Sequence, residues 1–180
     1  MREIKFVSID SSLANTGIAI GNIVDDNIFI VDTFLTETKK TKIKQVRASS
    51  DSIARCKQTY DFVHNIIKHI KPQLIIIETP SGSQSASGMK SYGSTCMLIA
   101  SLKPAPIEVT PMEVKLASVG HKKANKAQMI KWASDKYPKI KWLYHAGKLQ
   151  NKNEHIADAI AIAHAGILTK EFNRIKNINL

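Results

Sequence analysis

The sequence predicts an α/β domain in which a mixed central sheet of about five strands is flanked by helices. Two patterns lead to this prediction. Near the start of the chain, segments rich in β-branched and aromatic residues recur between turn-forming residues. From residue 51 onward, short apolar runs alternate with stretches in which apolar residues recur every three or four positions, as they do on one face of a helix. No repeat or linker interrupts the pattern, so residues 1–180 are interpreted as one domain.

The first strands form the simplest part of this prediction. Residues 4–9, 17–20 and 27–34 carry the β-branched and aromatic side chains of strands. Residues 11–16 and 25–27 between them are rich in Ser, Asn and Asp, which bond their own backbone in tight turns. We therefore expect an antiparallel meander of three strands.

The middle of the chain predicts a buried strand between helices. Apolar residues from Ile53 to Ile70 are spaced by three and four, and this helix should end before Pro72. Residues 74–77 are a continuous apolar run, which is typical of strands covered on both faces. A polar loop of small residues, a helix and a further strand follow, at residues 79–88, 89–102 and 107–109.

The last third of the chain predicts three more helices. Thr110-Pro111-Met112-Glu113 has the spacing of a capping box with proline at the first helical position, so a helix should cover residues 112–118. Further helices are expected at residues 125–137 and 154–168. The predicted order is βββ-α-β-α-β-α-α-α.

Composition limits the classes of protein to which the chain can belong. Its 26 Lys and Arg outnumber 15 Asp and Glu, giving a formal charge of +11, which attracts polyanions such as nucleic acid. The 43% hydrophobic content supplies a core and excludes a disordered basic tail. The sequence has neither a run long enough to span a membrane nor a signal peptide, so we expect a cytoplasmic protein. Cys56 and Cys96 are too few for a disulfide framework or a thiolate zinc site, and we expect buried, reduced thiols.

Four polar residues stand at unusual positions. Asp10 ends the first predicted strand and Glu78 ends the most hydrophobic one, where an unpaired carboxylate would be costly to bury. His155 and Asp158 are three residues apart, and therefore on one face, at the start of a helix made largely of Ala and Ile. Because so apolar a helix must pack on the sheet, its two polar side chains should meet Asp10 and Glu78 at the strand ends.

Three carboxylates and one imidazole favour Mg²⁺ or Mn²⁺ over a closed zinc site. Two such ions are the usual arrangement for cleaving a phosphodiester bond. Each residue also has an ordinary interpretation: Asp10 as a turn residue, Glu78 as an ion-pair partner, and His155 as a capping or core histidine. The delivery of an acid from three separate segments to the expected ends of elements favours the shared site.

Four segments between residues 7 and 163 together resemble a known family: IDSSLANTGIAI, LIIIETP, VTPMEVKLASVGHKKANKAQM and HIADAIAIA. This pattern is similar to the RuvC-type Holliday junction resolvases of the RNase H-like superfamily, including compact phage or viral members. The resemblance implies that Asp10, Glu78 and Asp158 bind metal, and that His155 occupies a position where the family has an acid or a histidine. It also implies a homodimer that cuts a four-way DNA junction by two symmetric nicks, leaving 3′-hydroxyl and 5′-phosphate ends.

The resemblance and the charge pattern together indicate which residues contact DNA. Lys115 and Lys126 lie at basic positions of the family, and three lysines gather around Gly120 where a helix begins. The family usually has an aromatic residue three positions after its second acid. That position is Ser81 here, and Tyr92 is the candidate substitute. The predicted DNA-binding residues are Lys90, Tyr92, Lys115, Lys122, Lys123 and Lys126.

Two further interpretations of the sequence concern surfaces. The aromatic residues Trp132, Tyr137, Trp142 and Tyr144 could stack on unpaired bases, although core packing is the favoured interpretation. The apolar faces of the helices at residues 53–70 and 89–102 are the candidate dimer interfaces.

Three functions remain open from the sequence, and the favoured one is a Mg²⁺-dependent endonuclease that resolves Holliday junctions and other branched DNA. A protein that binds branched DNA without cutting it is the first alternative. The second is an ATP-binding domain, because Asp10 followed by Thr16-Gly17 also resembles the phosphate-binding hairpin of sugar kinases and actin. That fold needs two such domains, and 180 residues supply one.

Overall fold

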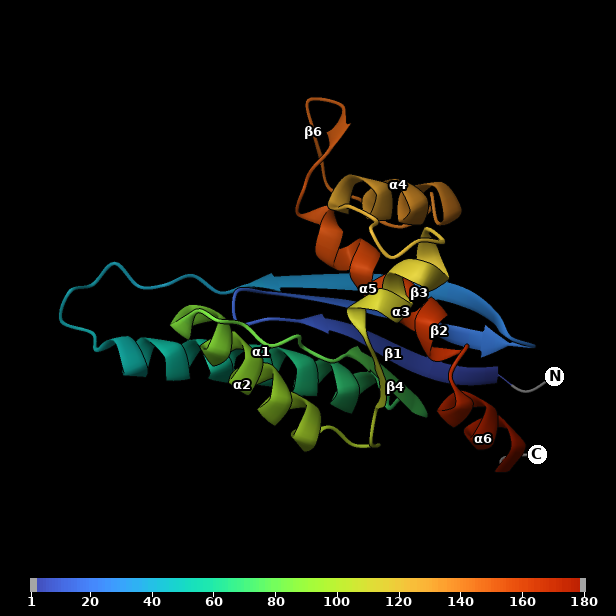
Figure 1. Cartoon of the computed structure of the whole chain (residues 1–180), viewed down its shortest axis with the longest axis horizontal. Helices are drawn as coiled ribbons and strands as arrows, with labels where there is room; N and C mark the ends of the chain where they lie inside the picture. Colours follow the sequence, from blue (N-terminus) through green and yellow to red (C-terminus); the bar gives the residue numbers. More distant parts are fainter. Residues whose placement is uncertain (1–2, 179–180) are drawn as a thin grey trace.

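The computed structural model describes residues 3–178, and their centre is a five-stranded mixed sheet in the order β3-β2-β1-β4-β5 (Figure 1). The first three strands form the expected antiparallel meander, whereas β1 pairs with β4, and β4 with β5, in parallel. The strands are β1 (Glu3–Ser11), β2 (Asn15–Val24), β3 (Asn27–Glu37), β4 (Leu74–Glu78) and β5 (Ile107–Val109). The predicted fold class is therefore confirmed.

Helices cover both faces of this sheet. In Figure 1, α1 and α2 lie on one face, and α3, α4 and α5 lie on the other. The helices are α1 (Ala48–Ile70), α2 (Ala86–Ser101), α3 (Pro111–Ser118), α4 (Lys126–Lys136), α5 (Asn153–Gly166) and α6 (Lys170–Ile178). The capping box of Thr110 and Glu113 is confirmed at α3. Helix α2 begins earlier than predicted because the Ser85 side chain accepts a hydrogen bond from the backbone N–H of Gly88.

The apolar run of β4 is buried on both faces, as its sequence predicts. Ile75 and Ile77 pack toward α1 and α2, in a cluster that includes Val63. Leu74 and Ile76 point to the opposite face and pack in the cluster that contains residues of α5. This strand therefore joins the two halves of the core, and its C-terminal residue is the first with a polar side chain.

Helix α5 lies directly against the antiparallel part of the sheet. The buried hydroxyl of Ser8 in β1 donates a hydrogen bond of 2.7 Å to the backbone oxygen of Ala159. A Cβ atom added to Gly17 in β2 would lie 2.0 Å from the backbone oxygen of His155, so only glycine permits this approach. These two contacts place the first turn of α5 beside the C-terminal end of β1.

Several smaller expectations need correction. The prediction of core packing holds for Trp142, which is buried, but is wrong for Tyr144, which is 59% exposed. Tyr144 belongs to a short hairpin that consists of β6 (Tyr144–His145) and β7 (Lys148–Leu149). Neither this hairpin nor α6 was predicted from the sequence. Cys56 and Cys96 are free, as expected, but only half-buried. Among residues 3–178, no helix has the length and apolarity needed to cross a membrane.

Candidate active site

Parallel pairing of β1 with β4 brings two carboxylates to the same edge of the sheet. Ile9 of β1 lies opposite Ile77 of β4 in the parallel register. The next residues are Asp10 and Glu78, so both side chains stand at the C-terminal end of the central strand pair. This is the edge at which open α/β sheets form their ligand sites.

The first turn of α5 supplies the other two predicted residues. The Nδ1 atom of His155 lies 2.8 Å from Oδ2 of Asp10, and the two side chains are 17% and 18% exposed. Asp158, one turn further along α5, is close enough to Asp10 and Glu78 that the three carboxylates repel one another. The structure therefore brings together all four residues that the sequence singled out.

Burial and, after it, charge repulsion raise the pKa values of two carboxyl groups in this cluster. Burial, together with the negative charges of Asp10 and Asp158, raises the pKa of Glu78 to about 8. Burial and the charge of Asp10 likewise raise the pKa of Asp158 to about 7, although His155 and Lys115 act in the opposite direction. Two carboxyl groups with pKa values near neutrality mark a site that lacks enough positive charge of its own.

His155 is held between acids. Burial alone would lower its pKa, but the hydrogen bond to Asp10 and the nearby negative charges outweigh burial and raise the pKa above the ordinary value. Its other ring nitrogen, Nε2, lies 3.4 Å from Oε1 of Glu154. The second oxygen of Glu154 pairs with Nζ of Lys126 at 2.7 Å. This chain of contacts fixes the imidazole and ties the start of α4 to the site.

Glu154 is the residue that sequence reasoning missed. An acid in the first turn of a helix has an ordinary explanation, because it interacts favourably with the helix dipole. The available signal was its position beside His155, at the end of a polar segment that leads into an apolar helix. Its side chain is only 15% exposed, and it contacts both His155 and Lys126.

The predicted DNA-binding residues fall into two groups. Half-buried Lys115 of α3 is near enough to act electrostatically on Glu78 and Asp158, while Lys122 and Lys123 are exposed just before α4. Lys90 and Tyr92 belong to α2, on the opposite face of the sheet. They flank Ser91, whose hydroxyl accepts a hydrogen bond from the backbone N–H of Leu13. This second group therefore lies beside the turn that follows β1.

The donor set suits a hard divalent cation, because it consists of carboxylate oxygens with one imidazole. Burial chiefly, and then repulsion between the carboxylates, raises the pKa values of Glu78 and Asp158, and a bound cation would oppose both effects by stabilising the charged forms. Within residues 3–178 the carboxylate, histidine and cysteine groups do not converge on a ready-made ion position. One oxygen of Asp10 is directed to His155.

Comparison with known proteins shows the family to which the chain is similar. The family model described as crossover junction endodeoxyribonuclease RuvC matches residues 6–165. A curated relative of that name from Prochlorococcus marinus strain MIT 9312 is 26% identical over 172 residues, covering 94% of this chain and 99% of the relative. The protein of the same name from strain AS9601 is 27% identical over 177 residues, with the same coverage.

Two solved structures share the fold over nearly the whole chain. Thermus thermophilus RuvC in complex with a Holliday junction substrate aligns with a TM-score of 0.63 and 17% identity, covering 96% of each chain. Fowlpox virus resolvase in complex with Holliday junction DNA aligns with a TM-score of 0.55 and 13% identity, covering 92% of this chain and all of the other. At these identities the likeness supports the fold.

Proposed function

This chain belongs to the crossover junction endodeoxyribonuclease RuvC family, and on that premise we propose that its four clustered polar residues form the catalytic centre of a Mg²⁺-dependent resolvase. The chain has the RNase H-like fold and is a junction-resolving nuclease whose cleavage depends on divalent metal. The proposed substrate is a four-way junction, with other branched DNA as a further proposed substrate class. The observation that carries the proposal is the meeting of residues from β1, β4 and α5, namely Asp10, Glu78, His155 and Asp158.

Two Mg²⁺ ions, or Mn²⁺ in their place, would activate water and neutralise charge on the departing oxygen when bound. Asp10 belongs to β1, which pairs with β4 and contacts α5, and its charge acts on both Glu78 and Asp158, so it is the proposed shared ligand. Its hydrogen bond to His155 holds the imidazole beside these carboxylates. His155 would bind the second ion or orient the attacking water through a ring nitrogen released from Asp10 or Glu154.

DNA binding is proposed to rely on lysines that surround this centre. Lys122 and Lys123 are exposed in the turn before α4, and the first turn of α4 contains Lys126. Backbone N–H groups at a helix start and nearby ammonium groups both suit phosphate oxygens. Lys115 would lie closest to the cleaved phosphate, since it already acts on Glu78 and Asp158.

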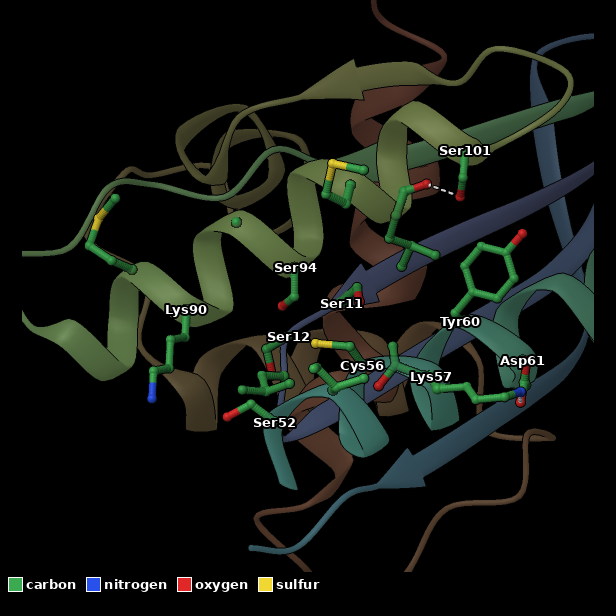
Figure 2. Close-up of a pocket in the computed structure, with 17 residues that line it drawn as sticks. Ser11, Ser12, Ser52, Cys56, Lys57, Tyr60, Asp61, Lys90, Ser94 and Ser101 are labelled. Atoms are coloured by element: carbon green, nitrogen blue, oxygen red, sulfur yellow. Dashed lines mark hydrogen bonds and ion pairs between the residues drawn. The ribbon is translucent and has the colours of Figure 1, made fainter. Parts of the chain in front are cut away.

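The proposed assembly is a homodimer, because a two-fold protein matches the two-fold symmetry of a four-way junction. An apolar groove of about 730 Å³ between α1 and α2 is the candidate interface. Figure 2 shows Cys56 and Tyr60 of α1 on one side of it and Lys90 of α2 on the other. Ile53 and Met97, which also line the groove, are 69% and 72% exposed. Burying such side chains against a second copy is favourable.

The oligomeric state tests the interface. Met97→Glu places a charge in the groove and should shift the protein toward the monomer in analytical ultracentrifugation. Val31→Glu is the matched control, because Val31 is 66% exposed on β3. A wild-type monomer at micromolar concentration, or a Met97→Glu dimer as tight as wild type, would contradict this assignment.

Cleavage of a labelled synthetic four-way junction tests the function itself. With Mg²⁺ we expect paired symmetric nicks, and with EDTA none. Asp10→Asn should lower the rate at least about a hundredfold, because it weakens a ligand of the proposed centre. Asp32→Asn, an exposed carboxylate of β3, is the matched control and should cut at the wild-type rate. Full activity of a folded Asp10→Asn variant would refute the site.

Parallel reactions with flap, fork and linear duplex define the substrate range. Cuts on the junction alone would indicate a strict resolvase, whereas cuts on every branched form would indicate a broader debranching nuclease. The family assignment favours either kind of nuclease over an ATP-binding domain or a DNA-binding protein that does not cut. The proposed place of action is the cytoplasm of a bacterial or virus-infected cell, and the bacterial relatives support the bacterial one.

A further inference from the structure

The β6–β7 hairpin, residues 144–149, projects from the body of the protein next to α4 and α5 (Figure 1). Its two-residue turn consists of Ala146 at φ 47° and Gly147 at φ 75°. Positive φ at both positions defines the tight turn that matches the twist of two antiparallel strands. A side chain with a Cβ atom rarely adopts this conformation, so Ala146 marks a strained hairpin tip.

The base of the hairpin is fixed to α5, the helix that carries His155 and Asp158. Asn153, the first residue of α5, is fully buried. Its side-chain amide donates a hydrogen bond of 2.8 Å to the backbone oxygen of Leu143, and its side-chain oxygen accepts one of 2.9 Å from the N–H of Leu143. His155 follows two residues later. The hairpin is thereby held at a defined position relative to His155.

The hairpin and its flanks carry only positive charge. The segment from residue 136 to residue 153 contains no Asp or Glu, and its lysines are Lys136, Lys139, Lys141, Lys148 and Lys152. At the base of the hairpin, Nζ of Lys152 lies 2.8 Å from Oε2 of Glu37. The same carboxylate oxygen lies 3.8 Å from Nζ of Lys39, in the lysine-rich loop after β3. Two basic segments therefore meet beside the start of α5.

An exposed aromatic ring completes the feature. Tyr144 is 59% exposed, and exposed His145 follows it in β6. A tyrosine that presents its ring to solvent among lysines has the chemistry of a nucleic-acid surface, in which cations bind phosphates and aromatic faces stack on bases. In branched DNA, the proposed substrate, the bases at the branch are the least well stacked and so are available to an aromatic side chain.

We propose that the β6–β7 hairpin is a second DNA-contacting element, separate from the lysines before α4: Lys148 binds a backbone phosphate, and Tyr144 stacks on a base at or near the branch point. The proposal rests on the proposed function of the neighbouring carboxylate site, because it places the hairpin on the DNA that this site cuts. The hairpin then helps to set which phosphate reaches Asp10.

Junction binding in EDTA tests the hairpin independently of cleavage. Tyr144→Ala should weaken binding of a labelled four-way junction about tenfold, and binding of linear duplex much less, because loss of stacking removes the preference for unpaired bases. Tyr144→Phe should bind as wild type, since stacking needs the ring and not the hydroxyl. Lys148→Ala should lower the slope of log affinity against log salt by about 1.

Lys131→Ala is the matched control, because this exposed lysine of α4 already pairs with Asp135 at 2.9 Å. It should leave both the affinity and the salt slope unchanged. If Tyr144→Ala and Lys148→Ala bind as tightly as wild type with the same slope, or if wild type does not bind the junction, the hairpin proposal is wrong. If wild type binds in EDTA and depends on Tyr144 but never cuts with Mg²⁺, the hairpin proposal stands and the proposed function fails.

Discussion

Replacing Glu78 with glutamine should stabilise the metal-free protein while abolishing cleavage. The pKa of Glu78 is raised from 4.5 to about 8 in the folded state, chiefly by burial and then by Asp10 and Asp158. A group with a raised pKa contributes its full stability below pH 4.5 and loses it as the pH rises toward 8. Each pKa unit corresponds to 1.36 kcal/mol, so the mismatch between the folded and unfolded pKa of Glu78 should lower the free energy of unfolding by about 4 kcal/mol at pH 8 and about 1 kcal/mol at pH 5. Glutamine, which stays neutral, avoids this cost.

The assay is urea unfolding of both proteins in EDTA, at intervals from pH 5 to pH 8.5. The advantage of Glu78→Gln over wild type should grow by about 3 kcal/mol between pH 5 and pH 8. Glu108→Gln removes an exposed carboxylate from the neighbouring strand, and its effect should stay within about 0.5 kcal/mol. Adding Mg²⁺ should stabilise wild type more than Glu78→Gln. An advantage that does not change with pH would refute the electrostatic description of the site.

Three further predictions concern the scaffold of the site. Gly17→Ala puts a Cβ atom against the backbone of His155, so it should lower the free energy of unfolding by about 2 kcal/mol or more. The cleavage rate should fall by a larger proportion, and equal losses in stability and rate would show that α5 is not displaced. Burial lowers the pKa of His164 to about 4, so wild type should lose about 3 kcal/mol of stability as the pH falls from 6.5 to 4. Urea unfolding of His164→Gln over the same pH range should not show that loss. Ala146→Gly should raise the melting temperature by relieving the left-handed conformation of the hairpin tip, and a lower melting temperature would show that the turn is unstrained.

Local sequence signals predicted those elements whose burial follows a simple pattern. The apolar run of residues 74–77 identified a central strand because every side chain of that strand is buried, whichever face it points to. Thr110 and Glu113 identified the start of α3 because each satisfies a backbone or side-chain group of the other. Asp10 and Glu78 stood out because each follows directly on the buried residues of its strand.

The elements that were missed depend on contacts between distant parts of the chain. Helix α6 is short and mostly polar, and its Phe172 is 1% exposed only because the main core lies beneath it. The β6–β7 hairpin lacks the usual Asn-Gly turn, and it is anchored by buried Asn153, whose role a sequence pattern does not reveal. Glu154 gained its contact with Lys126 only when α4 and α5 came together.

The three acids of the site come from the beginning, middle and end of the chain, on β1, β4 and α5. No fragment that lacks one of these segments holds all three. A chain that is still folding, or one in which α5 has detached from Gly17, carries its basic residues but not an assembled centre. Such a form can adhere to DNA without the means to break it. With these acids in their proposed role, their long sequence separation acts as a safeguard, because it would restrict strand cutting to molecules that have completed their fold.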